Sequence, residues 1–97
     1  MITHDDIESL GFEKVDEWST DVTDAYVYRV NRYDKPKNTQ NVYRLDRLIN
    51  TDYMELVSSL ENEMYFQMRT YSFNGELENI DDLFELFEQF KEANRKI

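Results

Sequence analysis

Four carboxylates near the C-terminus are spaced so that they could act together as one anionic surface. They follow one another at intervals of four, three and four residues: Asp81, Glu85, Glu88 and Glu92. This spacing places them on one face of a helix, where acids repel at about 0.2–0.5 kcal/mol per neighbouring pair. Lys91 and Lys96 are close enough to relieve part of that repulsion. Such a ridge could imitate a line of phosphates, and an ordinary solvated helix face is the alternative.

Three acids near the N-terminus could extend the same surface. They are Asp5, Asp6 and Glu8. Together with the four acids near the C-terminus, they form the expected contact set for a partner protein with a basic surface. A surface of this sign would speed association by electrostatic attraction and make binding sensitive to salt.

The centre of the chain has the opposite charge. Residues 1–28, 29–47, 48–90 and 91–97 carry net charges of −7, +4, −9 and +2. Arginine and tyrosine interleave in the basic block, and the candidates there for a second interface are Arg29, Arg32, Tyr33, Tyr43, Arg44 and Arg47. Three interpretations stay open: pairing with the chain's own acids, a protein interface, in which Tyr and Arg are enriched, or contact with nucleic acid. The surrounding negative field disfavours the last.

Catalysis and metal binding have little support. The chain has no cysteine and a single histidine, His4, which we expect to be a surface residue of a short helix. No glycine-rich phosphate loop, nucleophile elbow or calcium loop is present. We therefore expect no catalytic residue, no metal site, no cofactor and no enzymatic activity.

The elements that would position these side chains begin with a helix over residues 4–10. Thr3 is the expected N-cap, and Ile2 and Ile7 are placed as a hydrophobic staple across it. Gly11 suits a left-handed C-terminal cap. The N-terminal acids then lie in and near the first turn, where the helix dipole favours negative charge.

Strands are expected next. Residues 12–18 fit a short edge strand with Trp18 in the core, and residues 24–33 and 41–49 fit a hairpin joined by turn-forming residues 34–40. Residues 50–61 match both helical and strand periodicity, and we favour a strand at 53–58.

A further strand is expected over residues 64–73. Alternation assigns its side chains to two faces: Met64, Phe66 and Met68 to the core, and Tyr65, Gln67, Arg69 and Tyr71 to the outside. The pair Asn74-Gly75 indicates a turn after it.

The last element is an amphipathic helix over residues 80–94, capped by Asn79. We therefore expect an α+β fold in a single domain, residues 1–97. An antiparallel sheet of four or five strands would carry both helices on one face, as a two-layer sandwich. The other face of the sheet would lack a covering helix.

Composition agrees with a folded domain. The 97 residues are 40% hydrophobic and 14% aromatic, which exceeds what a disordered acidic tail contains. The net charge of −10 disfavours nucleic acid or an anionic membrane as a direct partner. No apolar run approaches a membrane span and no signal peptide is evident, so we expect a cytoplasmic protein.

Two stretches resemble the small acidic accessory proteins of tailed bacteriophages. One is the acidic helix that leads into Leu-Gly-Phe, Ile2 to Phe12, and the other is the strand, Asn-Gly and helix start from Tyr71 to Leu83. Some of those proteins block host defence nucleases or other nucleic-acid-binding proteins by occupying their basic grooves. The resemblance implies this role and carries over no site residue.

The leading hypothesis is a non-enzymatic binding protein, encoded by a phage, that inhibits a host protein through an acidic, DNA-mimicking surface. The alternative is a structural or assembly protein that forms homo-oligomers through its Tyr/Arg-rich sheet face.

Overall fold

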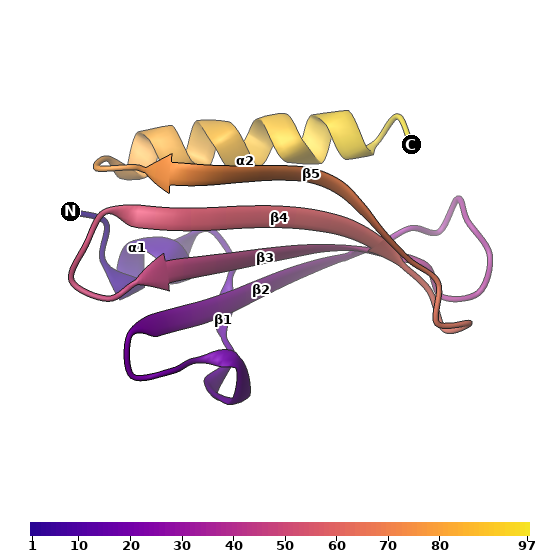
Figure 1. Cartoon of the computed structure of the whole chain (residues 1–97). Coiled ribbons are helices and arrows are strands. Elements are labelled where there is room, and N and C mark those ends of the chain that lie inside the picture. The colour runs from indigo at the N-terminus through magenta and orange to yellow at the C-terminus, as the bar shows by residue number, and fades with distance from the viewer.

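The computed structural model covers all 97 residues, in two layers (Figure 1). A five-stranded antiparallel sheet has the order β1-β2-β3-β4-β5, so each strand pairs with its neighbour in the chain. In chain order the elements are α1 (His4–Ser9), β1 (Glu13–Lys14), the 3₁₀ helix η1 (Asp16–Trp18), β2 (Thr23–Asn31), β3 (Gln40–Leu48), β4 (Tyr53–Glu61), β5 (Gln67–Glu76) and α2 (Ile80–Asn94). The expected α+β class is confirmed. Neither helix has the length and apolar character needed to span a membrane.

Helix α1 begins and ends as its local sequence predicts. The Thr3 hydroxyl accepts a hydrogen bond from the Asp6 amide, and the Asp6 carboxylate accepts one from the Thr3 amide. Ile2 and Ile7 are both buried, as a hydrophobic staple requires. Gly11 has φ +101°, and a Cβ there would lie 2.7 Å from the Tyr28 ring, so only glycine fits.

One face of the sheet carries the core. Phe87 of α2 lies at its centre, with ring centroids 4.8 Å from Phe12, 5.2 Å from Tyr28 and 5.2 Å from Tyr43. Both helices and the covered faces of β2, β3 and β4 contribute buried side chains: Ile2, Ile7, Phe12, Tyr26, Tyr43, Leu45, Met54, Leu56, Leu83, Phe87 and Phe90. Both helices therefore pack on the same side of the sheet, and neither α-helix covers the opposite side, which we call the open face.

The expected hairpin over residues 24–49 is confirmed by β2 and β3. The strand expected at 53–58 is also confirmed and extends to Glu61. The edge strand expected over residues 12–18 is only two residues long, because η1 follows it. Trp18 was expected in the core and is instead half-buried on the open face, beside Arg44.

The expectations for β5 were partly wrong because this strand contains a bulge. Ser58 pairs with Tyr71, whereas Ser59 pairs with Arg69, so Thr70 is an extra residue in the ladder. The Ser58 hydroxyl holds the bulge by hydrogen bonds to the Thr70 hydroxyl, at 2.6 Å, and to the Tyr71 amide, at 3.2 Å. Tyr71 is thereby turned toward α2, where its ring lies 5.9 Å from that of Phe90.

The two ends of β5 also differ from expectation. Met64 and Phe66 belong to the turn before β5 and are exposed, and so is Met68, so none of the three is a core residue. Asn74 and Gly75 do not form a turn, because they lie inside β5 and pair with Glu55 and Met54.

Candidate functional site

The four carboxylates of α2 are exposed on one helix face, but they do not form one uniform ridge. Glu88 lies 2.6 Å from the Lys91 ammonium, and Glu92 lies 3.2 Å from the Arg95 guanidinium. Asp81 and Glu85 have no lysine or arginine within 4.0 Å. The N-terminal half of the predicted ridge is therefore unneutralised, and the C-terminal half is locally paired.

The unneutralised half belongs to a larger acidic surface at one end of the molecule. Helix α2 begins beside the β3–β4 turn, since the Leu77 amide donates to the Asp52 carbonyl at 2.8 Å and Tyr53 pairs with Glu76. Six carboxylates without a basic partner gather here, and we call them the acidic end: Asp52, Glu76, Glu78, Asp81, Asp82 and Glu85. Sequence spacing could not show that Asp52 joins this group, because it lies in the turn between β3 and β4.

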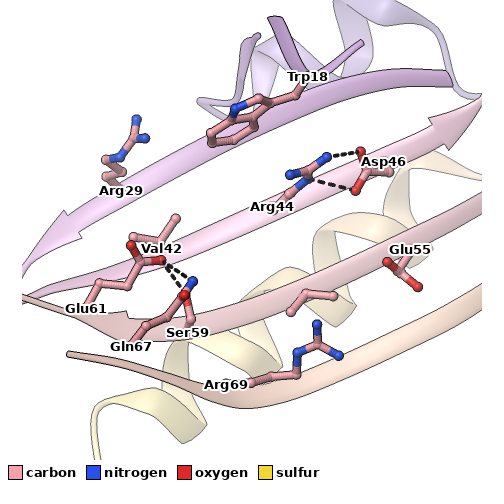
Figure 2. A pocket seen from close by; sticks show the side chains of 11 residues that line it. Trp18, Arg29, Val42, Arg44, Asp46, Glu55, Ser59, Glu61, Gln67 and Arg69 are labelled. Carbon is pink, nitrogen blue, oxygen red and sulfur yellow. Dashed lines mark hydrogen bonds and ion pairs between the residues drawn. The ribbon is translucent and has the colours of Figure 1, made fainter. Parts of the chain in front are cut away.

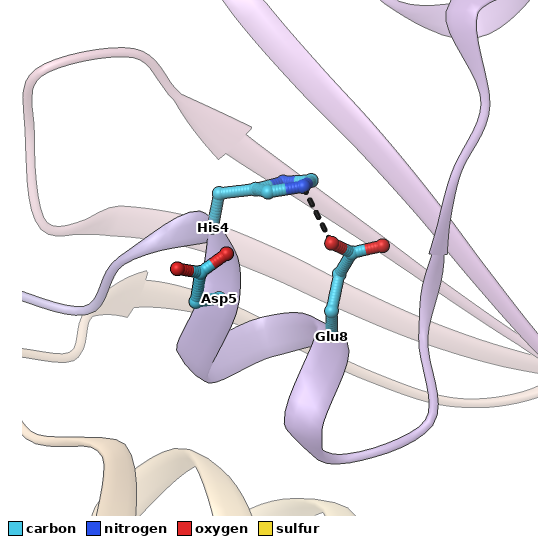
Figure 3. A group of neighbouring side chains, drawn as sticks. All are labelled: His4, Asp5 and Glu8. Atoms are coloured by element: carbon cyan, nitrogen blue, oxygen red, sulfur yellow. Dashed lines mark ion pairs between the residues drawn. The ribbon is translucent and has the colours of Figure 1, made fainter.

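Helix α1 lies toward the same end of the sheet (Figure 1), and the Arg47 guanidinium fixes it there by donating to the Ile2 carbonyl at 2.8 Å. Two of the three acids of α1 already make contacts within this helix. Asp6 caps the helix, and Glu8 lies 2.7 Å from His4 Nε2 (Figure 3). Asp5 alone of the three has no such partner.

His4 is a tertiary contact as well as a surface residue. Its Nδ1 lies 2.9 Å from the buried Tyr26 hydroxyl, while Nε2 contacts Glu8. The ligand atoms of His4, Asp5 and Glu8 lie within 4.8 Å of one another. Because both ring nitrogens are engaged, a cation could use this group only by displacing the His4–Glu8 contact. Burial raises the pKa of Tyr26 above its ordinary value.

The residues proposed for the second interface do not lie together on one surface. Arg32 is almost buried and pairs with Asp34 through two hydrogen bonds of 3.0 Å, and it also donates to the Asn94 and Ile97 carbonyls. Tyr43 is in the core, where burial raises its pKa. Tyr33 is 91% exposed on the β2–β3 loop.

Arg47 also pairs internally, on the covered side of the sheet. Its guanidinium lies 3.1 Å from the Asp24 carboxylate, which Lys14 approaches to 3.4 Å. Burial raises the pKa of Asp24, but the Arg47 hydrogen bond and the Lys14 charge outweigh it, so the pKa lies below its ordinary value. Internal pairing is therefore the correct interpretation for Arg32 and Arg47.

Arg29 and Arg44 instead lie on the open face, where both line a groove of about 650 Å³ (Figure 2). The Arg44 guanidinium pairs with Asp46 at 3.0 Å and lies 4.7 Å from the centre of the Trp18 ring. The lining is mostly polar and charged: Trp18, Arg29, Val42, Arg44, Asp46, Glu55, Val57, Ser59, Glu61, Gln67 and Arg69.

The strand register arranges the open face in rows that run across the sheet. One row holds Arg29, Val42, Ser59 and Arg69, and we call it the cationic row. Four residues away along β2, β3 and β4, an anionic row holds Ala25, Asp46, Glu55 and Asn74. Between them lie Val27, Arg44, Val57 and Ser72.

Several side chains in these rows have no charged partner within the chain. Arg29, Arg69 and Glu55 form no ion pair shorter than 4.0 Å. Alternation along β5 correctly predicted that Arg69 faces outward. The sequence carries no local signal that would align Arg69 with Arg29 across four strands, because that alignment depends on three separate registers.

The fold and the two surfaces define an α+β protein with an open-faced antiparallel sheet and one acidic end. The chain matches no protein-family model, no curated protein and no solved structure. The two surfaces are therefore interpreted from their own geometry.

Proposed function

We propose that this chain is a non-enzymatic binding protein whose acidic end occupies a basic surface on a partner protein. That basic surface would be of the kind that otherwise holds nucleic-acid phosphates. In line with the resemblance to phage accessory proteins, the partner would be a host defence factor, and the chain would inhibit it in the host cytoplasm. The observation that supports this proposal is the concentration of unpaired carboxylates where α2 begins.

The distribution of the bases favours one end of the molecule as the contact. The molecule is elongated, with extents of 40 × 27 × 20 Å. Lys35, Lys37 and Lys96, which lack acidic partners, lie in the β2–β3 loop and after α2, at the end opposite the acidic end. At physiological ionic strength charges are screened over about 8 Å, so the partner would sense the acidic end and not the net charge.

A pair of variants with equal net charge can test this location. Asp81→Asn with Glu85→Gln removes two charges from the acidic end, and Glu88→Gln with Glu92→Gln removes two from the paired half of α2. Each variant and the unmodified chain would be immobilised and exposed to bacterial host lysate at low and at high salt. We expect a basic protein to be retained at low salt and released at high salt.

The location of the charge should decide retention. We expect the Asp81/Glu85 variant to lose most of the retained partner, on the order of tenfold, and the Glu88/Glu92 variant to lose little. Thermal unfolding would verify that both variants fold, because Asp81 also stabilises the helix N-terminus by about 0.3–1 kcal/mol. Equal retention by the two variants, or no basic protein at low salt, would contradict the proposal.

A further inference from the structure

We infer that the open face of the sheet is an interface between two copies of this chain, related by a two-fold axis that runs along the rows. The inference concerns a different surface from the acidic end and does not depend on the proposed function. It follows from three features of the open face: its balanced charge, its row order and its size.

The groove carries equal numbers of opposite charges. Three arginines, Arg29, Arg44 and Arg69, face three acids, Asp46, Glu55 and Glu61. The whole chain has a net charge of −10, so this balanced region is where two copies can approach without local repulsion. A polyanion or a strongly basic partner would meet as much repulsion as attraction there, which favours a second copy as the occupant.

The row order makes the face complementary to itself. A two-fold axis along the rows reverses the strand direction, and it therefore exchanges the cationic and anionic rows between copies. Glu55 of the second copy then lies opposite Ser59, one strand away from Arg69. Asp46 of the second copy lies opposite Val42, one strand away from Arg29.

These separations suit ion pairs. Neighbouring strands lie about 4.8 Å apart and packed sheets about 10 Å apart, a gap that an arginine and an acid span together. The alternative two-fold axis, along the strands, would place Arg29 opposite Arg69 and Asp46 opposite Glu55, with like charges facing each other. The charges thus select one orientation.

The centre of the interface is less polar than its edges. In the middle row Val27 is already buried within the chain, so the exposed apolar surface comes from Val57 and from Trp18, whose ring has Arg44 beside it. An aromatic residue and an arginine on a protein surface are common anchors of interfaces. In the dimer, the unpaired Arg29, Arg69 and Glu55 would all gain a partner of opposite charge.

The available area indicates a weak dimer. Four strands at about 4.8 Å and nine residues at about 3.3 Å give a face on the order of 600 Å². This value is an upper limit, because Val27, Val42 and Ser59 on this face are already buried within the chain. The two faces together reach about 1,200 Å², the lower limit for stable interfaces. We therefore expect monomer and dimer to exchange as concentration changes.

The test is a charge-reversal cycle in sedimentation equilibrium at about 0.15 M salt. We expect concentration-dependent dimerisation of the unmodified chain. Glu55→Arg and Arg69→Glu should each weaken it at least tenfold, because each sets like charges against each other. The double variant should restore most of the affinity, since it recreates the pair in reverse.

Matched controls separate the position of a charge from its sign. Glu78→Arg and Lys96→Glu change the net charge by the same amounts but lie away from the open face. We expect them to leave dimerisation within about twofold. Glu55→Arg lowers the net negative charge, which by itself would favour association, so weaker association in that variant would be specific to the face.

Two results would overturn the inference. One is a monomer at all concentrations up to the millimolar range. The other is a dimer whose affinity does not change with Glu55→Arg or Arg69→Glu, or is not recovered in the double variant. Asp81→Asn with Glu85→Gln should not affect the dimer, so failure here and failure of the proposed function are distinguishable.

Discussion

The two faces of the sheet are built from alternate residues of the same strands, yet they have different roles. In β4, Leu56 is fully buried under the helices, and its neighbour Val57 lines the open groove. The covered face is continuous with the aromatic cluster around Phe87, whereas the open face holds charged rows. The covered face therefore supplies most of the free energy of folding, and the open face can carry charged side chains because no helix packs on it.

The largest expected difference between the two faces of the sheet is in stability, and the neighbours Leu56 and Val57 test it. We expect Leu56→Ala to lower the free energy of unfolding by about 2–5 kcal/mol, because it leaves a cavity in the core. Val57→Ala should cost less than about 1 kcal/mol, since no helix packs above it. Urea unfolding measures both values. Similar losses for the two variants would mean that the open face also contributes a core.

A smaller effect is expected from the polar network of the covered face. The Asn94 side chain is buried and donates to the Tyr43 hydroxyl at 3.3 Å and the Ser58 hydroxyl at 3.1 Å. Asn94→Ala should cost about 1–3 kcal/mol, because it leaves buried hydroxyls without this donor. The control is Gln67→Ala on the open face, where we expect a change within about 0.5 kcal/mol. Thermal or urea unfolding would measure the loss of stability in both variants. A larger loss for Gln67→Ala than for Asn94→Ala would contradict this prediction.

The smallest expected effect depends on pH. The pKa of Asp24 is lowered in the folded state, so its ion pair stabilises the fold above the unfolded pKa, near 4, and is lost as pH falls further. Asp24→Asn should therefore flatten the fall in stability below about pH 4. Unfolding midpoints of the variant and the parent, measured across this range, should converge at low pH.

Glu55→Gln is the control for the pH experiment, because Glu55 lies on the open face without a basic partner. We expect its curve to follow that of the parent. Parallel curves for Asp24→Asn and the parent would show that the Asp24–Arg47 pair does not contribute to acid stability.

Much of the fold could be predicted from local sequence. The Thr3 cap, the β2–β3 hairpin and the α2 helix follow from side-chain chemistry within a few residues of each element. The side-chain directions in β5 could not be predicted beyond Thr70, because the bulge shifts the alternation by one residue. Met64 and Phe66 were wrongly predicted to be core residues, because they lie in a turn where the apolar alternation suggested a strand.

Only the parts of the candidate surfaces that depend on spacing within one helix could be predicted from the sequence. Helical spacing correctly placed Glu85 and Glu88 on one exposed face, but it could not show which acids pair with Lys91 and Arg95. The cationic row required the registers of β2 through β5. Those registers arise from long-range packing, which one sequence does not reveal.

The bulge at Thr70 also bears on how the molecule avoids uncontrolled aggregation. β5 is an outermost strand, and its backbone amides and carbonyls on one side have no partner strand. An uninterrupted edge of ten residues would be a template for edge-to-edge pairing with strands of other molecules. The extra residue breaks that template near its middle, so further strands cannot add along its whole length.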